Sequence, residues 1–157
     1  MKTFNKNDFV HERASIENSV RKRNHHLIHD SHCEPVQFLY INLCSESYIP
    51  PHKHINNNQW EFFQLLDGEI DLLIFTDDGR LENRLHLNTH DLFSVKIPAN
   101  VFHTILCRSE YALMLEVKEG PFKTEYAKEI ACWASEEKID NSDWLKKLRI
   151  LEVGQRL

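Results

Sequence analysis

Three histidines and one glutamate are spaced so that they could bind a single metal ion. His52 and His54 are separated by one residue, and side chains two positions apart on a β-strand point to the same face. Glu61 lies in the next apolar run, and His103 comes from a distant one. Imidazole nitrogens with a carboxylate oxygen suit Mn, Fe, Ni, Cu or Zn better than Mg or Ca, which prefer oxygen alone. The spacing therefore predicts a divalent transition-metal site inside a β-barrel.

The same histidines also have a simpler interpretation. The chain has 10 histidines in 157 residues, so one His-x-His pair can occur by chance and lie solvated at a strand end. The surrounding sequence favours the metal site, because six residues separate Glu61 from Gly68 and Pro98 precedes His103 by five positions. A motif of this kind needs a structural context, here ligand strands joined by tight turns.

Short apolar runs that favour β-structure recur along the middle of the chain. Asp67-Gly68 and Asp77-Asp78-Gly79 are tight-turn signals between such runs. Short strands at regular spacing are typical of a sandwich or barrel, and separated ligands can converge only if the sheet curls around them. The sequence therefore predicts an all-β fold, with strands at residues 36–43, 60–66, 69–76, 81–87, 91–97, 103–108 and 111–118.

Two short motifs resemble those of the cupin superfamily. They are Pro51-His52-Lys53-His54 with residues 61–68, and residues 98–103. The flanking segments, over nearly the whole chain, resemble the WbuC family of cupin-fold metalloproteins; they are residues 21–23, His29, residues 34–37, 47–49, 116–121 and 131–134, and Glu136. The resemblance implies a double-stranded β-helix, or jelly-roll barrel, and an association with bacterial O-antigen and other surface-polysaccharide gene clusters.

The chain departs from the cupin motifs at two places. Six residues separate His54 from Glu61, more than cupins usually have, so Gln59 stands nearer the usual distance and is an alternative ligand. We prefer Glu61, since a carboxylate binds a divalent cation better than a neutral amide does. In the second motif Asn100 replaces the usual glycine, and asparagine tolerates a left-handed backbone better than most residues.

Length and composition limit the class of protein. A chain of 157 residues with 41% apolar residues fits one domain with its own core. A net charge of −5 argues against a general nucleic-acid-binding protein. No apolar run approaches the roughly 20 residues of a membrane span, and the first ten residues lack the apolar segment of a secretory signal. We expect a cytoplasmic protein whose four cysteines are reduced.

We expect three segments within this single domain. Residues 1–34 form an N-terminal extension that packs on the barrel, with weak helical spacing at 9–16; residues 35–120 form the barrel. Residues 121–157 form a helical segment, with one helix over 123–133 and another beginning after Asn141 or Ser142. Free strand edges and the apolar Trp133, Trp144, Leu145 and Leu148 predict a homodimer. The alternative is a monomer whose C-terminal helices cover their own barrel.

Five further residues are candidates for handling a small-molecule ligand. Glu116, at a strand end among apolar residues, is the candidate catalytic acid or base; a rim carboxylate paired with a lysine is the alternative. Read with the resemblance, Arg23 could bind an anionic group of the ligand instead of being solvated. Cys107 shares its strand parity with His103 and should line the pocket. Tyr48 and His29 complete the set of substrate-binding candidates.

Together these features predict a metal-binding protein of the cupin fold. We expect an enzyme, isomerase-like or epimerase-like, that acts on a small sugar-like or polar metabolite. The resemblance to the WbuC family implies that it works in bacterial surface-polysaccharide (O-antigen or lipopolysaccharide) biosynthesis. One alternative is an iron-dependent oxygenase, since His-rich sites with open positions also activate dioxygen. A second alternative is a sensor or other protein that binds a small molecule without turnover.

Overall fold

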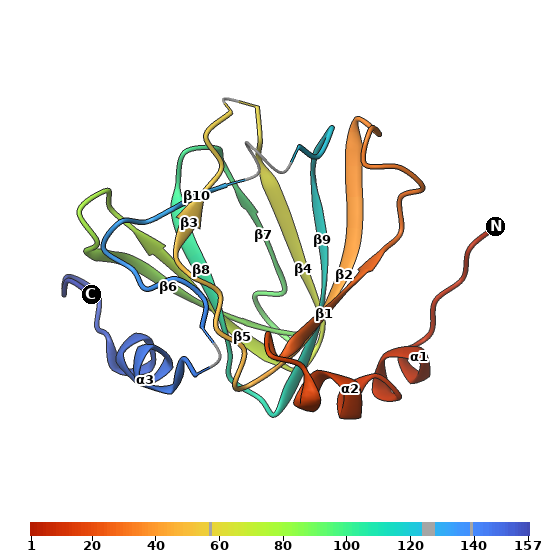
Figure 1. The fold of residues 1–157 in the computed structure, drawn as a ribbon, viewed down its shortest axis with the longest axis horizontal. Coiled ribbons are helices and arrows are strands. Elements are labelled where there is room, and N and C mark those ends of the chain that lie inside the picture. Colours follow the sequence, from red (N-terminus) through yellow and green to blue (C-terminus); the bar gives the residue numbers. More distant parts are fainter. Residues whose placement is uncertain (57, 124–127, 139) are drawn as a thin grey trace.

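Two antiparallel β-sheets that face each other make up most of the protein (Figure 1). The structure is a computed structural model, and it describes all residues except 57, 124–127 and 139. The strand order is β1-β2-β9-β4-β7 in the first sheet and β10-β3-β8-β5-β6 in the second. From β2 to β10 the chain crosses to the other sheet at every connection except that from β5 to β6, which is the arrangement of a jelly roll. The predicted all-β fold is confirmed.

Each of the seven predicted strands is present, with ends shifted by three residues at most. The first sheet contains β1 (Arg23–Leu27), β2 (Val36–Cys44), β4 (Glu61–Asp67), β7 (Ser94–Ile97) and β9 (Tyr111–Glu119). The second contains β3 (His52–Lys53), β5 (Glu69–Phe75), β6 (Leu81–Asn88), β8 (Phe102–Cys107) and β10 (Glu129–Ile130). Strands β1 and β10 were not predicted, and β3 was expected only from the shared face of His52 and His54; all three lie next to the candidate site described below.

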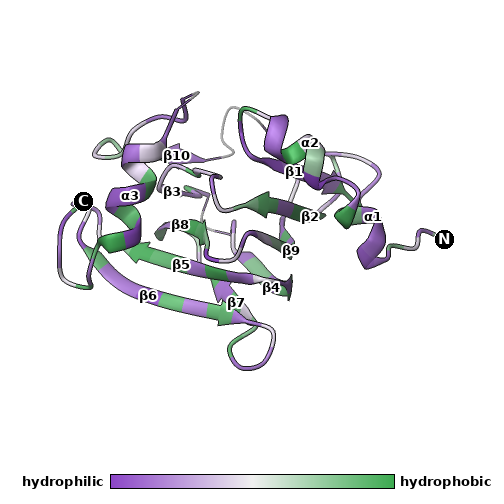
Figure 2. Cartoon of the chain, turned by 90° about the horizontal axis from the view of Figure 1, so that it is seen from below, coloured by the Kyte–Doolittle hydropathy of each residue, from purple (hydrophilic) through white to green (hydrophobic). Residues whose placement is uncertain are grey.

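The apolar core lies between the sheets and continues behind the second sheet. Leu43, Ile70 and Met114 are fully buried among the inward-facing side chains. Strand β8 is buried along its whole length because its outer face is covered as well. Figure 2 shows that strands of the second sheet differ in hydropathy: β5 is largely hydrophobic, whereas β6 alternates between hydrophobic and hydrophilic residues. A sheet buried on both faces gives a firm support for side chains that point into the barrel.

The N-terminal residues add both helices and a strand to the first sheet. Helices α1 (Lys6–Val10) and α2 (Arg13–Asn18) replace the single helical stretch expected at 9–16. They bury Phe9 and Ile16, and the side-chain amide of Asn42 donates a hydrogen bond to the Phe9 carbonyl at 2.8 Å. Strand β1 then pairs with β2 along its full length, so this segment extends the sheet.

The helix predicted over 123–133 is wrong where the structure describes it. Residues 124–127 lie outside the described residues, and Glu129–Ile130 form β10, which pairs with β3. The spacing of apolar residues that suggested a helix is overridden here by hydrogen bonding to a free strand edge. The second predicted helix is confirmed as α3 (Ser142–Ile150).

Helix α3 covers the outer face of the second sheet of its own chain. Its Leu145 and Leu148 are buried together with Leu73 and Leu106 of that sheet. The apolar stripe that motivated the predicted homodimer is therefore covered within one chain. The free edges of the two sheets remain as the motivation for a dimer, which stays a prediction. Among the described helices, none is both long and apolar enough to pass through a membrane.

Candidate metal centre

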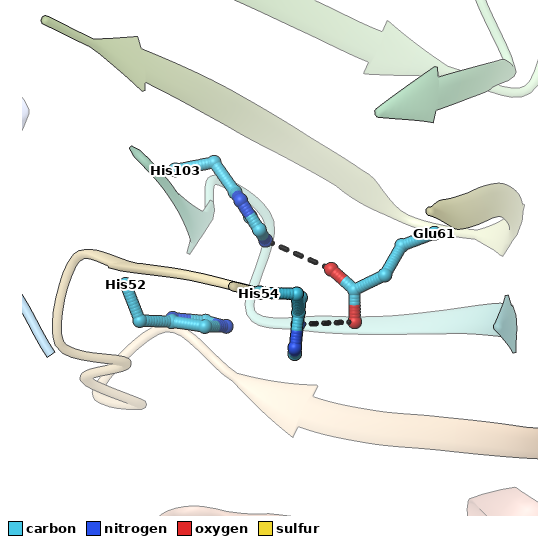
Figure 3. Close-up of side chains that lie close together, drawn as sticks. All are labelled: His52, His54, Glu61 and His103. Atoms are coloured by element: carbon cyan, nitrogen blue, oxygen red, sulfur yellow. Dashed lines mark ion pairs between the residues drawn. The ribbon is translucent and has the colours of Figure 1, made fainter. Parts of the chain in front are cut away.

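The four predicted metal ligands come together between the two sheets (Figure 3). One nitrogen or oxygen atom from each of His52, His54, Glu61 and His103 lies within 4.8 Å of the other three, and all four residues are buried. His52 and His103 are direct partners in the register of β3 and β8, so their side chains leave the second sheet side by side. Glu61 begins β4 on the opposite sheet. This donor set could bind a transition-metal ion.

Backbone carbonyls fix the orientation of two of the imidazoles. The Nδ1 atom of His52 lies 2.9 Å from the Pro50 carbonyl, and that of His103 lies 2.9 Å from the Val101 carbonyl. A carbonyl oxygen only accepts, so each Nδ1 must carry the hydrogen and donate it. In the neutral ring this leaves a lone pair on Nε2, directed into the site. Metal-binding histidines commonly donate a hydrogen bond of this kind from the ring nitrogen that does not bind the metal.

The Glu61 carboxylate lies between two of the imidazoles. Its Oε1 is 2.9 Å from His54 Nε2, and its Oε2 is 2.9 Å from His103 Nε2. Despite the short distance, Glu61 Oε2 and His103 Nε2 are buried without a hydrogen bond of acceptable angle among the described residues. Buried polar atoms are normally hydrogen-bonded, and a cation held between the two lone pairs would satisfy both. The residues therefore fit a metal ion.

The charges in the site favour a cation. Burial raises the pKa of Glu61, but the close His103 and His54 imidazoles outweigh this effect and hold that pKa well below its usual range. Burial lowers the pKa of His103, yet the Glu61 carboxylate more than compensates and raises it. Burial also holds the pKa of His52 well below its usual range, so this ring is neutral. The ionised Glu61 and the neutral His52 are thus in the protonation state that metal binding requires, whereas a bound metal ion would have to displace the proton that Glu61 favours on His103.

A cavity of about 380 Å³ opens next to these residues. This volume lies in the range of about 300 to 1,000 Å³ that is usual for small-molecule sites. One part of its wall is apolar, with Leu39, Ile41 and Phe63 among the lining residues. The remainder is polar and charged, and includes Glu116. A ligand in this cavity would reach the metal ligands directly, because His52, His54, Glu61 and His103 also line it.

Glu116 and Lys118 form a buried ion pair beside the metal ligands. Both lie on β9 and point to the cavity, since they are two residues apart on one strand. Lys118 Nζ lies 2.5 Å from Glu116 Oε1 and 3.9 Å from Glu61 Oε1. Burial raises the pKa of Glu116, and the positive charge of Lys118 opposes this. The alternative anticipated for Glu116, a pair with a lysine, is thus present, but inside the cavity and not on the rim.

Two of the predicted substrate-binding residues line the cavity. Arg23 is 4% exposed, and its guanidinium donates to the Tyr48 carbonyl and to Glu137, which sequence reasoning missed. His29 lies on the rim, and its Nε2 is buried without a partner in the described part of the chain. Both positions allow contact with a ligand.

Tyr48 and Cys107 lie away from the cavity, contrary to the expectation. Tyr48 points behind the second sheet, where its hydroxyl donates to the Ser135 carbonyl at 2.8 Å. Cys107 has the strand parity of His103 but lies four residues further along β8, about 13 Å at the usual rise per residue. There it is enclosed in the core, and burial raises the pKa of its thiol to about 11. We assign neither residue to ligand binding.

Gln59, the alternative ligand, lines the cavity but is not one of the four clustered residues.

We expect Glu61→Gln to raise the dissociation constant for zinc about 100-fold or more, because even loss of a group supporting a ligand costs about 10- to 100-fold. Gln59→Ala should leave it nearly unchanged. Competition titration of purified protein with a chromogenic chelator measures both. A larger effect of Gln59→Ala would show that the loop before β4 carries the ligand.

Comparison with known proteins identifies the fold. Residues 4–87 match the model of a family described as a domain of unknown function, DUF6016. No curated protein matches the chain in sequence. Among solved structures, a protein from Shewanella oneidensis superposes with a TM-score of 0.62 at 11% identity, covering 98% of this chain and 100% of that one. At this identity the similarity concerns the fold.

Two further solved structures share the barrel. A protein from Silicibacter pomeroyi, described as a sugar phosphate isomerase of the cupin superfamily, gives a TM-score of 0.52 at 17% identity over 66% of this chain and 63% of that one. KdgF from Halomonas sp. gives 0.51 at 11% identity over 66% of this chain and 83% of that one. The fold is the cupin double-stranded β-helix, as the sequence motifs suggested.

Proposed function

The chain belongs to the DUF6016 family, a domain of unknown function, and we propose that it is a metal-dependent enzyme acting on a small sugar-like metabolite. The observation that carries the proposal is the position of four clustered metal-binding side chains on the wall of a cavity large enough for such a molecule. The buried ion pair of Glu116 and Lys118 lines the same cavity. A metal site used only for stability would be closed off from any ligand.

The residues around the cavity are suited to moving a proton within a substrate. A bound divalent ion would polarise a carbonyl or hydroxyl oxygen of the substrate. Glu116 would take a proton from the neighbouring carbon and return it, with Lys118 holding the carboxylate in place at 2.5 Å. Leu39, Ile41 and Phe63 would keep water from the reacting atoms. The reaction class is that of a sugar isomerase or epimerase, and the protein from Silicibacter pomeroyi that shares the fold is described as a sugar phosphate isomerase.

An iron-dependent oxygenase is the second candidate, favoured by the three imidazoles of the donor set. A protein that binds a small molecule without turnover is the third. For all three, the resemblance to the WbuC family supports a role in bacterial surface-polysaccharide assembly, with the protein working in the cytoplasm as a homodimer. A sugar-like ligand is consistent with that role.

The test combines metal content with exchange of substrate hydrogen. Freshly purified protein is analysed for bound metals, then incubated in heavy water with a panel of aldoses, ketoses and their phosphates, and NMR follows loss of carbon-bound hydrogen. We expect about one divalent ion per chain and exchange that stops with a chelator and returns with the metal. Iron with oxygen consumption but no exchange would support the oxygenase. Absence of metal from the protein would overturn the proposal.

A further inference from the structure

Positive charge collects at one part of the cavity wall and is only partly neutralised. Four basic residues line the cavity, and one of them, Lys118, is paired with Glu116. The other three are Arg21, Arg23 and Lys128. Arg21 Nε lies 3.2 Å from Glu137 Oε2, and Arg23 Nη1 lies 2.6 Å from Glu137 Oε1, so both guanidinium groups share one carboxylate. That arrangement leaves one positive charge unbalanced.

Lys128 adds a second unbalanced charge. No acidic side chain lies within ion-pair distance of its ammonium group in the described part of the chain. Lys128 immediately precedes β10, in which Ile130 is the partner of His52 and Glu129 the partner of Lys53. Because side chains alternate along a strand, Lys128 and Ile130 share the face of His52. This places Lys128 on the cavity side of the sheet, at the start of the strand that pairs with β3 and its metal ligand His52.

Arg21 has free hydrogen-bond donors that could bind a ligand, whereas most of the donors of Arg23 already have partners. Arg23 is buried and donates to the Tyr48 carbonyl at 3.1 Å as well as to Glu137, which makes it a rigid support. Arg21 is exposed, and among the described residues only its Nε donates a hydrogen bond. Its two terminal amino groups remain able to bind a planar or tetrahedral oxyanion.

The pKa of the neighbouring His25 is also affected by this positive charge. The pKa of His25 is lowered to about 4, first by desolvation and then by the charges of Arg23, Arg21, Lys118 and Lys128. His25 is therefore a neutral hydrogen-bonding group at neutral pH. An anion bound nearby would remove much of the repulsion and raise this pKa.

Uncharged polar atoms occupy other parts of the wall. His29 Nε2 and Gln59 Oε1 are both buried and lack a hydrogen-bond partner among the residues that the structure describes. Both residues line the cavity. Unsatisfied buried groups of this kind are costly, and hydroxyl groups of a ligand can satisfy them.

We propose that the cavity contains a subsite for an anionic group, formed by Arg21 and Lys128, and that the substrate is a sugar bearing a phosphate or a carboxylate. Arg23 is a positioning residue that holds Glu137 and the strand beneath the subsite. The hydroxyl groups of the same sugar bind His29 and Gln59, and its carbonyl faces the metal ligands. The inference rests on the proposed function for the reacting end of the substrate, but the subsite itself needs no metal.

The test compares three sugars that differ in charge. Calorimetry measures the binding of glucose 6-phosphate, glucuronate and glucose to the purified protein, before and after treatment with a chelator. We expect at least one anionic sugar to bind about 10-fold or more tightly than glucose, since hydrogen bonds to charged groups are the strong ones. The anionic sugar that binds more tightly shows whether the subsite prefers a phosphate or a carboxylate.

Variants assign the effect to the named residues. Lys128→Gln and Arg21→Gln should each raise the dissociation constant of the anionic sugar about 10-fold and leave that of glucose unchanged. The matched control is Lys146→Gln, because Lys146 is an exposed lysine of α3 on the outer side of the second sheet. This variant should bind all three sugars as the unaltered protein does. In NMR titrations the anionic sugar should raise the pKa of His25, and glucose should not. Equal affinity for all three sugars, or no effect of Lys128→Gln, would overturn the subsite.

The outcomes separate this inference from the proposed function. If the protein holds no metal but binds an anionic sugar through Lys128, the metal-dependent enzyme fails and the subsite stands. If metal-dependent exchange occurs equally on neutral and anionic sugars, the enzyme stands and the subsite fails. Should none of the three sugars bind, inorganic phosphate is the remaining probe, and an unchanged pKa of His25 in its presence would end the proposal.

Discussion

Replacing His103 with alanine should abolish stoichiometric metal binding, with the dissociation constant for zinc raised more than about 100-fold. His103 is 2% exposed, its Nδ1 is fixed by the Val101 carbonyl, and its Nε2 lies 2.9 Å from Glu61. Removing it takes away one of four donors and the partner that keeps Glu61 ionised. Since loss of a supporting group alone costs about 10- to 100-fold, loss of a ligand should cost more. Competition titration and elemental analysis measure the effect.

His52→Ala and His54→Ala should behave in the same way. The matched control is His90→Ala, because His90 is an exposed histidine in the loop after β6, far from the clustered ligands in sequence. It should keep one metal ion per chain. Circular dichroism of each variant checks that the barrel still folds. Full metal retention in all three ligand variants would refute the centre as described.

Apolar runs made the fold predictable, and the alternation of side chains along a strand made the metal ligands predictable. Short apolar runs bounded by turn residues located β2, β4, β5, β8 and β9 to within a few residues, because strands that bury one or both faces are rich in apolar side chains. The same alternation placed His52 and His54 on one face. Their convergence with Glu61 and His103 followed from the closure of the sheet, which a barrel imposes.

The short strands β1, β3 and β10 carry no hydrophobic pattern of their own, so the apolar runs of the sequence did not reveal them; β1 and β10 lie at sheet edges, and β3 lies between β10 and β8. Strand β1 has the sequence RNHHL, and β3 and β10 have two residues each. Such strands form because a neighbouring strand offers unpaired backbone groups, which is a property of the tertiary structure. For the same reason, the apolar spacing at 123–133 was misread as a helix, although Ile130 pairs with His52.

Strand parity gives the face of a side chain but not its depth along the barrel. Cys107 and His103 share a face of β8, yet only His103 lies at the cavity. Lys118 could have been found, since it is two residues from Glu116 on a predicted strand. Lys128 and Glu137 could not, because they lie in the C-terminal segment and meet Arg23 only through the tertiary fold.

Glu116→Gln should lower the rate of substrate hydrogen exchange by about 100- to 10,000-fold while the protein keeps its metal, since general acid–base catalysis contributes about that much. Glutamine fills the same volume and cannot take a proton. Glu116 is not one of the four clustered ligands, and Lys118 keeps Glu61 as an acidic neighbour at 3.9 Å. Metal affinity should therefore change little. The readout is NMR in heavy water on a sugar that the unaltered protein exchanges.

Glu119→Gln is the matched control for this variant. Glu119 lies on the same strand and also lines the cavity, but it is three residues away and thus has the opposite strand parity. Its substitution should leave exchange nearly unchanged. If Glu116→Gln instead lost metal in parallel with activity, Glu116 would act by supporting Glu61 through Lys118. Exchange at the unaltered rate in metal-loaded Glu116→Gln would show that another group moves the proton.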